Sequence, residues 1–126
     1  MRDLLFKDST RNKTFVVKRS RRGVKEAWLT SRALSSAAPT PWGDCSPILV
    51  TMGTGRSHQI RVQFSTRGMP LVGDGKYGVN HKSKSGKQYQ MLCSHYLKFD
   101  FKTDGGILSY LDGKEFYSGF DMESLL

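Results

Sequence analysis

The chain has 126 residues, a length that favours a single domain over residues 1–126 with one modest hydrophobic core. Its 37% hydrophobic and 25% charged residues are typical of a globular protein and exclude a chain that is disordered by composition. Lysine and arginine number 20 against 11 aspartates and glutamates, so the net charge is +9 and predicts a polyanionic partner.

The cysteines and the hydropathy favour a reduced, cytoplasmic protein. Cys45 and Cys93 are the only cysteines, and two such distant residues do not make a disulfide scaffold. The first residues lack the long apolar core of a signal peptide, and no run approaches the roughly 20 apolar residues of a membrane span. We therefore expect no membrane partner.

The first half of the chain predicts short strands separated by loops. Residues 8–12 read as a turn, and the dense basic run 18–22 is expected to form a loop that Gly23 closes. Residues 35–47, rich in Ser, Ala and Pro, predict a long loop. The expected strands are 14–17, 25–34 and 48–52. The second of these also fits a helix, and we prefer the strand because extended segments flank it.

One helix is expected between Ser57 and Gly68. Gly53 and Gly55 lead into Ser57, whose hydroxyl oxygen is suited to cap the first turn of a helix. Gly68 is placed to end the helix in a left-handed conformation. The second half of the chain adds a loop at 73–78, a polar mobile segment at 80–88, strands at 91–101, 107–111 and 115–117, and a weakly helical or disordered tail at 121–126. These elements predict an α+β fold, with a mainly antiparallel mixed sheet and one main helix.

The start of this helix predicts an anion-binding site. The first backbone N–H groups of a helix lack partners and carry partial positive charge. Arg56, His58 and Arg61 surround them with donors, and Arg61 can bind a carboxylate or a phosphate with two hydrogen bonds. The alternative is that Arg56 and Arg61 balance carboxylates within the fold.

Further candidates for contacts with nucleic acid lie outside the helix start. Arg19, Arg21 and Arg22 in the basic run either contact phosphates or belong to a solvated loop. Tyr77, beside Lys76, is suited to stack on a base.

The sequence predicts neither a metal nor an organic cofactor. Cys93 and His95, taken with Cys45 and His58, have the wrong spacing for a structural zinc site, and His95 is expected to be a structural histidine.

Asp74 lies between two glycines, where it is expected to close a turn through its own side chain.

A specific motif extends from residue 55 to residue 78. It consists of Gly55-Arg56-Ser57-His58-Gln59-Ile60-Arg61-Val62, then Gly68, Pro70, Gly73-Asp74 and Tyr77-Gly78. This motif resembles the signature of the RNA pseudouridine synthases of the RluA type, within the RsuA/RluA-like group. Residues 25–29 and 91–99 also resemble strands of that family, so the resemblance covers most of the chain. It implies isomerisation of uridine to pseudouridine in rRNA or tRNA, without metal or organic cofactor.

The resemblance implies a role for Arg61, and the anion site, the basic run and Tyr77 supply the expected RNA contacts. Arg61 occupies the position that pairs with the catalytic aspartate of the family. The residues that we expect to contact RNA are Gly55, Arg56, Ser57, His58, Gln59, Lys76, Tyr77, Arg19, Arg21 and Arg22.

The family's aspartate lies in an Arg-Leu-Asp motif, which does not occur in this sequence. We therefore expect the C-terminal portion of a catalytic domain, as a fragment, a truncated gene product or a member that has lost its nucleophile. Such a chain would be inactive alone, with Arg61 facing an empty or solvent-filled position. The alternatives are a non-catalytic RNA-binding module, or a half-domain that pairs with a missing N-terminal segment or with a copy of itself.

Overall fold

The structure is a computed structural model that describes residues 1–78 and 89–119. The chain divides into two compact units, Met1–Met91 and Leu92–Leu126, and each is described by itself. The prediction of a single domain over residues 1–126 stays a prediction. The predictions of a mobile segment at 80–88 and of a weak helix or disorder at 121–126 lie outside the described residues.

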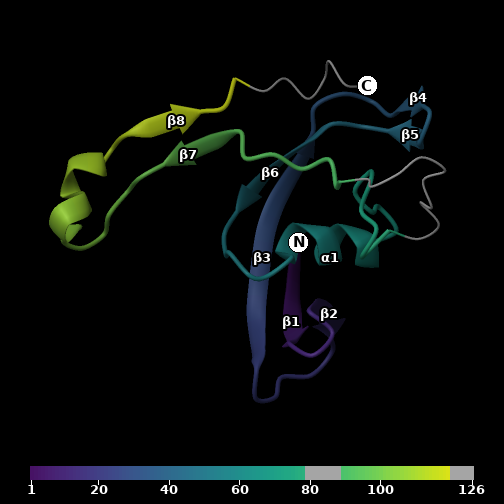
Figure 1. The fold of residues 1–126 in the computed structure, drawn as a ribbon, viewed down its shortest axis with the longest axis horizontal. Coiled ribbons are helices and arrows are strands. Elements are labelled where there is room, and N and C mark those ends of the chain that lie inside the picture. The colour runs from purple at the N-terminus through teal and green to yellow at the C-terminus, as the bar shows by residue number, and fades with distance from the viewer. Residues whose placement is uncertain (79–88, 120–126) are drawn as a thin grey trace. The chain divides into compact units, whose positions relative to one another are not determined.

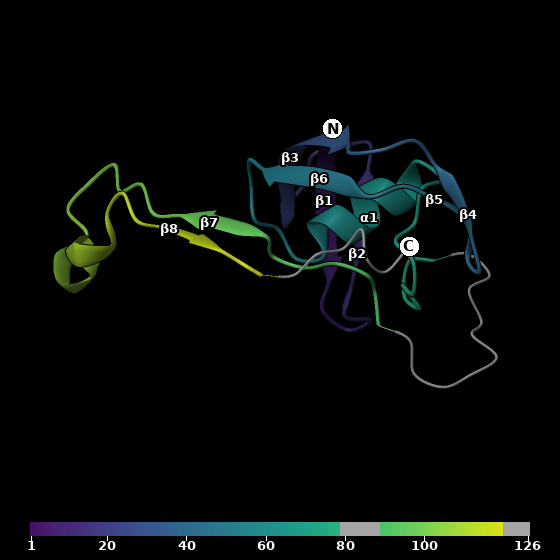
Figure 2. The ribbon, with the colours of Figure 1, turned by 90° about the horizontal axis from the view of Figure 1, so that it is seen from above.

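The described residues of the first unit form a four-stranded antiparallel sheet and one helix, which packs against one face of that sheet (Figures 1 and 2). Its elements are β1 (Arg2–Asp8), β2 (Lys13–Val17), β3 (Val24–Ala33), β4 (Ala38–Thr40), β5 (Gly43–Cys45), β6 (Ile48–Met52) and α1 (Gln59–Thr66). The strand order is β2-β1-β3-β6, and β4 pairs with β5 in a separate hairpin. The α+β class, the antiparallel sheet and the three strands expected in this region are confirmed.

Strand β1 lies between β2 and β3, although the sequence pattern does not predict it. Its alternation places Asp3, Leu5 and Lys7 on the face that meets α1. Leu5 packs in the core, Asp3 accepts a hydrogen bond from Gln63 of α1, and Lys7 lines a pocket beside the start of the helix. Because two of these three inward residues are charged, the strand lacks the alternation of apolar and polar residues that identifies a half-buried strand in a sequence.

The core of the first unit is small. It consists of Leu5, Ala27, Val62 and Tyr77, with Val16 packed against them. The main sheet and α1 both contribute to it, so the helix is fixed against the sheet by apolar contacts.

The helix ends as the sequence predicts. Gly68 has a φ of +76° and donates its N–H to the carbonyl of Ser65, while the N–H of Met69 returns to the carbonyl of Phe64. These two bonds satisfy carbonyls of the last turn, and the positive φ explains the glycine at this position.

Up to residue 119, where its description ends, the second unit forms a short antiparallel ribbon and one segment of 3-10 helix. Its elements are β7 (Tyr96–Lys98), η1 (Gly106–Leu111) and β8 (Glu115–Tyr117), and Leu97 pairs with Phe116 in the ribbon. The strand expected at 115–117 is confirmed. The strand expected at 91–101 is shorter, and its residues 96–98 are exposed rather than half-buried.

The strand predicted at 107–111 is wrong, because these residues form η1. Asp104 accepts the N–H of Gly106 through its side chain, and Gly106 has a φ of +54°. This local turn starts a helical segment in place of an extended one.

Candidate functional site

The start of α1 is held differently from the sequence prediction. The residue before the helix is His58, which has a left-handed φ of +53° and makes no side-chain cap bond. Ser57 does not cap the helix, and its carbonyl accepts a hydrogen bond from the hydroxyl of Thr14 at 3.0 Å. The buried side chain of Gln59 instead accepts the N–H of Arg56 at 3.0 Å. The cap prediction for Ser57 is therefore wrong, because Gln59 provides the side-chain acceptor for the loop.

Gln59 also ties this loop to the sheet. Its amide nitrogen donates to the carbonyl of Trp28 at 3.0 Å, and its amide oxygen accepts the hydroxyl of Thr54 at 2.8 Å. The side chain is 2% exposed. In this structure Gln59 is buried and fixes the shape of the loop that carries Arg56.

Arg61 forms a two-pronged ion pair with Asp74. Its Nε lies 2.8 Å from Oδ2 and its Nη2 lies 2.6 Å from Oδ1. Oδ1 also accepts the backbone N–H groups of Lys76 and Tyr77, each at 3.0 Å, so Asp74 closes its turn as predicted. Arg61 therefore does not face only an empty or solvent-filled position, because the carboxylate of Asp74 accepts two of its N–H groups. The sequence left open whether Arg61 binds an external anion or balances a carboxylate of the fold, and in this structure it balances the carboxylate of Asp74.

The ion pair is buried and stays ionised at neutral pH. The side chains of Arg61 and Asp74 are 15% and 0% exposed. Burial alone would raise the pKa of Asp74, but the hydrogen bonds from Arg61 and from the two backbone N–H groups outweigh it, so the pKa of this carboxyl lies below its usual value. The hydrogen bond to Asp74 likewise raises the pKa of Arg61.

Tyr77 and His58 extend this buried network. The phenol oxygen of Tyr77 accepts the backbone N–H of Thr14 at 2.7 Å and lies 2.9 Å from Nδ1 of His58. Burial, followed by the charges of Arg61 and Lys76, lowers the pKa of His58. A neutral imidazole can accept the Tyr77 O–H at Nδ1, which satisfies the hydroxyl as both donor and acceptor.

The side chain of Tyr77 is not placed for stacking on a base in this structure. The residue is 7% exposed, and the guanidinium carbon of Arg61 lies 5.2 Å from the ring centroid. Tyr77 therefore acts here as a core residue and a hydrogen-bonding group. The side chain of Tyr89, by contrast, is largely accessible to solvent, with 79% of the residue exposed.

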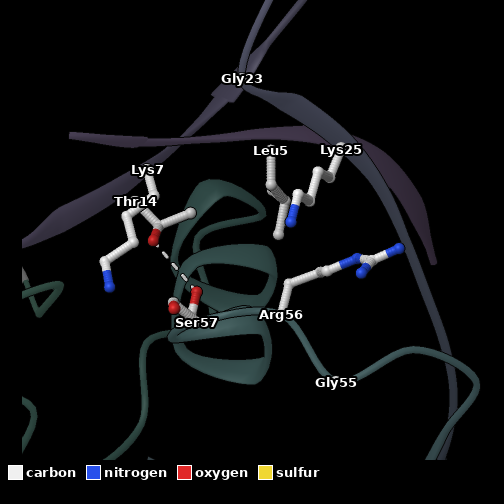
Figure 3. Close-up of a pocket in the computed structure, with 8 residues that line it drawn as sticks. All are labelled: Leu5, Lys7, Thr14, Gly23, Lys25, Gly55, Arg56 and Ser57. Atoms are coloured by element: carbon white, nitrogen blue, oxygen red, sulfur yellow. Dashed lines mark hydrogen bonds between the residues drawn. The ribbon is translucent and has the colours of Figure 1, made fainter. Parts of the chain in front are cut away.

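A pocket of about 190 Å³ opens beside the loop that precedes α1 (Figure 3). Its lining residues are Leu5, Lys7, Thr14, Gly23, Lys25, Gly55, Arg56 and Ser57. Three of them are cationic and none is acidic. Figure 3 shows Lys25 extending from β3 beside Leu5, while Arg56 rises from the loop on the opposite side.

The predicted site residues thus separate into distinct groups. The pocket brings together Gly55, Arg56 and Ser57, which are exposed, whereas His58, Gln59, Arg61 and Tyr77 belong to the buried network. Lys76 donates its ammonium to the carbonyl of Asn12 at 2.8 Å. Arg19, Arg21 and Arg22 are exposed in the loop before Gly23. The RNA contacts of all these residues, and the catalytic role of Arg61, stay predictions.

Lys7 and Lys25 are the cationic pocket residues that the sequence did not identify as candidates. The register places Leu5 opposite Lys25 across β1 and β3, and Lys7 two residues beyond Leu5 on the same face. The alternation of β3, in which Lys25, Ala27 and Leu29 share a face, is visible in the sequence. It identifies Lys25 as inward-facing once the strand is accepted.

Within the described residues, no group of histidine, cysteine and acidic side chains is arranged to hold a metal ion. In the same part of the chain, no helix has the length and apolar character needed to cross a membrane. His95, expected to be a packed or hydrogen-bonded structural residue, is exposed, and its ring meets the edge of Tyr117 with 6.4 Å between centroids.

The sequence is similar to that of a protein from Aquifex aeolicus (strain VF5) named "Uncharacterized RNA pseudouridine synthase". The two are 29% identical over 101 residues, which cover 75% of this chain and 30% of that protein. The chain spans less than a third of the length of this relative. No family model and no solved structure matches the chain.

Proposed function

We propose that this chain is part of the catalytic domain of an RNA pseudouridine synthase of the RluA type, which isomerises uridine in rRNA or tRNA. The observation that supports this most directly is the similarity to the A. aeolicus protein over 101 residues. The resemblance of the motif at residues 55–78 supports the choice of the RluA type, and the net charge of +9 suits an RNA substrate. We place the protein in the cytoplasm, where its free cysteines stay reduced.

In this proposal Arg61 presents a guanidinium to the catalytic aspartate. An arginine side chain carries five N–H donors, and Asp74 accepts two of them. The remaining donors are available to a second carboxylate, and the rigid pairing with Asp74 fixes the direction in which they point. A guanidinium held in this way keeps a neighbouring aspartate ionised and oriented.

Asp74 does not suit the role of the nucleophile itself. Its side chain is fully buried, and its two oxygens accept four hydrogen bonds, from Arg61 and from the backbone of Lys76 and Tyr77. A carboxylate engaged in this way cannot reach a uridine base. We assign Asp74 the role of positioning Arg61.

Because the chain contains no Arg-Leu-Asp motif, we infer that the catalytic aspartate is not among these 126 residues. We propose that the chain alone does not isomerise uridine and that activity requires an additional segment that supplies this aspartate. The test compares the chain as given with the chain joined to any coding sequence found upstream of Met1. Pseudouridine in a structured RNA is measured by mass spectrometry after digestion to nucleosides.

The longer protein should form pseudouridine and the given chain should not. In the longer protein, Arg61→Lys keeps the charge but loses the two-pronged geometry, so the rate should fall by about 100-fold, the cost of misplacing a catalytic group. Arg67→Lys is the matched control, because Arg67 directly follows the same helix and pairs with Asp3 at 2.9 Å. It should change the rate by less than about threefold.

Absence of activity in both proteins would refute the enzymatic proposal. Salt-dependent RNA binding without isomerisation would instead support a non-catalytic RNA-binding module. An equal loss of activity in Arg61→Lys and Arg67→Lys, with both proteins folded, would remove Arg61 from the catalytic centre.

A further inference from the structure

Two lysines project from the face of the sheet that elsewhere forms the core. On β1, Leu5 and Lys7 share a face, and on β3, Lys25 and Ala27 share the corresponding face. Leu5 and Ala27 are 3% and 0% exposed and pack against the helix. On a sheet face that packs against the core, the neighbouring inward positions of each strand are normally apolar as well. Lys7 and Lys25 therefore mark the edge where the core gives way to an open pocket.

The loop before α1 supplies the opposite wall of this pocket. Nε of Arg56 donates to the carbonyl of Glu26 at 3.0 Å, which holds the guanidinium beside β3. A Cβ placed on Gly55 would meet nothing within 4 Å, so the backbone here borders open space. Among the described residues, the backbone N–H groups of Gly55 and Ser57 have no hydrogen-bond acceptor.

The pocket combines these donors without a compensating acid. Lys7, Lys25 and Arg56 form no ion pair within residues 1–78 and 89–119, and no carboxylate lines the pocket. Three cations around an open cavity repel one another, and a bound anion relieves that repulsion. The volume of about 190 Å³ is below the roughly 300–1,000 Å³ of pockets that enclose whole drug-sized ligands, so it suits one small group.

We propose that this pocket binds a phosphate group of the RNA backbone through Lys7, Lys25, Arg56 and the backbone N–H groups of the loop. The inference rests on the proposed function only for its choice of RNA as the source of the phosphate. Gly23 lines the pocket and directly follows Arg21 and Arg22 in the exposed basic loop. A strand anchored in the pocket thus meets further cations along that loop.

The test measures binding of a single-stranded RNA of about 12 nucleotides by fluorescence anisotropy, at salt concentrations between roughly 25 and 200 mM. This range is wide enough to determine how steeply the binding constant falls with salt as counterions are released. The double variant Lys7→Gln/Lys25→Gln is compared with the control Lys102→Gln/Lys114→Gln. Both remove two positive charges from exposed positions, and the control residues lie in the second unit. Thermal unfolding verifies that both variants fold.

The pocket variant should bind RNA roughly tenfold more weakly at low salt, and the slope of log K against log salt should fall by about 0.7 for each phosphate that the variant no longer neutralises. The control should keep the slope of the unmodified chain. Equal losses of affinity in both variants, or no RNA binding by the unmodified chain, would overturn the proposal.

A second arm separates RNA from free phosphate. Inorganic phosphate is titrated into ¹⁵N-labelled protein, and the amide signals of Gly55 and Ser57 are followed by NMR. Shifts that Lys7→Gln/Lys25→Gln abolishes, together with weakened RNA binding, support the proposal. Shifts without any effect of the variant on RNA binding would assign the pocket to free phosphate and overturn it. Neither readout depends on isomerisation, so failure here is distinct from failure of the enzymatic proposal.

Discussion

Replacing Arg61 by alanine should destabilise the first unit far more than the same change at Arg67. Both arginines lie on or next to α1 and both bind an aspartate with two nitrogens. The side chains of Arg61 and Asp74 are 15% and 0% exposed, against 32% and 13% for Arg67 and Asp3. The comparison therefore changes burial while keeping the substitution and the type of partner constant.

The expected magnitudes follow from this difference in burial. Arg61→Ala leaves a buried carboxylate without its cation, a change that costs about 3–5 kcal/mol. Arg67→Ala breaks a pair that water can reach, at a cost of about 1 kcal/mol. The total stability of a domain is about 5–15 kcal/mol, so the first variant loses a large share of it.

Urea denaturation followed by tryptophan fluorescence measures both costs. Trp28 and Trp42 are the only tryptophans and both lie in the first unit, so the signal reports on the unit that contains the ion pair. The double variant Arg61→Ala/Asp74→Asn removes the stranded charge and keeps an oxygen for the two backbone N–H groups. It should recover more than half of the loss. Equal costs for Arg61→Ala and Arg67→Ala, or a double variant no more stable than Arg61→Ala, would refute the reasoning.

Two further predictions concern the same network and the loop that follows α1. Because the pKa of His58 is lowered in the folded protein, its contribution to stability is complete above pH 6.5 and is lost as the pH falls toward the folded pKa. Between pH 7.5 and pH 5.5, the melting temperature should therefore fall by more in the unmodified chain than in the variant His58→Asn. Asparagine tolerates the left-handed φ of this position but has no imidazole facing Tyr77. Parallel curves of melting temperature against pH would contradict this prediction. Gly73→Ala should cost more than about 2 kcal/mol, because Gly73 has a φ of +74° and an added Cβ would clash with the carbonyl of Tyr89. Gly75→Ala, whose Cβ would meet nothing within 4 Å, should cost less than about 1 kcal/mol, and denaturation midpoints that place the two variants together would count against the clash.

The sequence predicts those parts of the fold in which one local signal dominates. The end of α1 follows from Gly68, since a left-handed residue after a helix favours glycine. Residues 14–17 are β-branched and aromatic and form most of β2. The turn at Asp74 is closed by its own carboxylate, as expected from an aspartate between glycines.

Prediction fails where a distant contact replaces the local signal. Ser57 has the residue type of a helix cap, but its carbonyl is bound by Thr14, 43 positions away, and Gln59 holds the loop instead. The partner of Arg61 is another case, because Asp74 lies 13 positions further along the chain. No pattern in the sequence distinguishes this pairing from one with a ligand, so it depends on the tertiary structure.

The proposed phosphate pocket and the buried ion pair of Arg61 use different residues around the start of α1. Further along the same two strands, the inward side chains are Asp3 and Ala27, which face the helix. Both lysines line the pocket beside the loop, whereas Leu5, which lies directly opposite Lys25, packs in the core. Arg61, within the first turn of α1, is instead committed to Asp74. An anion that approaches this end of the first unit thus meets cations of the sheet and the loop, while the arginine inside the helix remains reserved for a carboxylate.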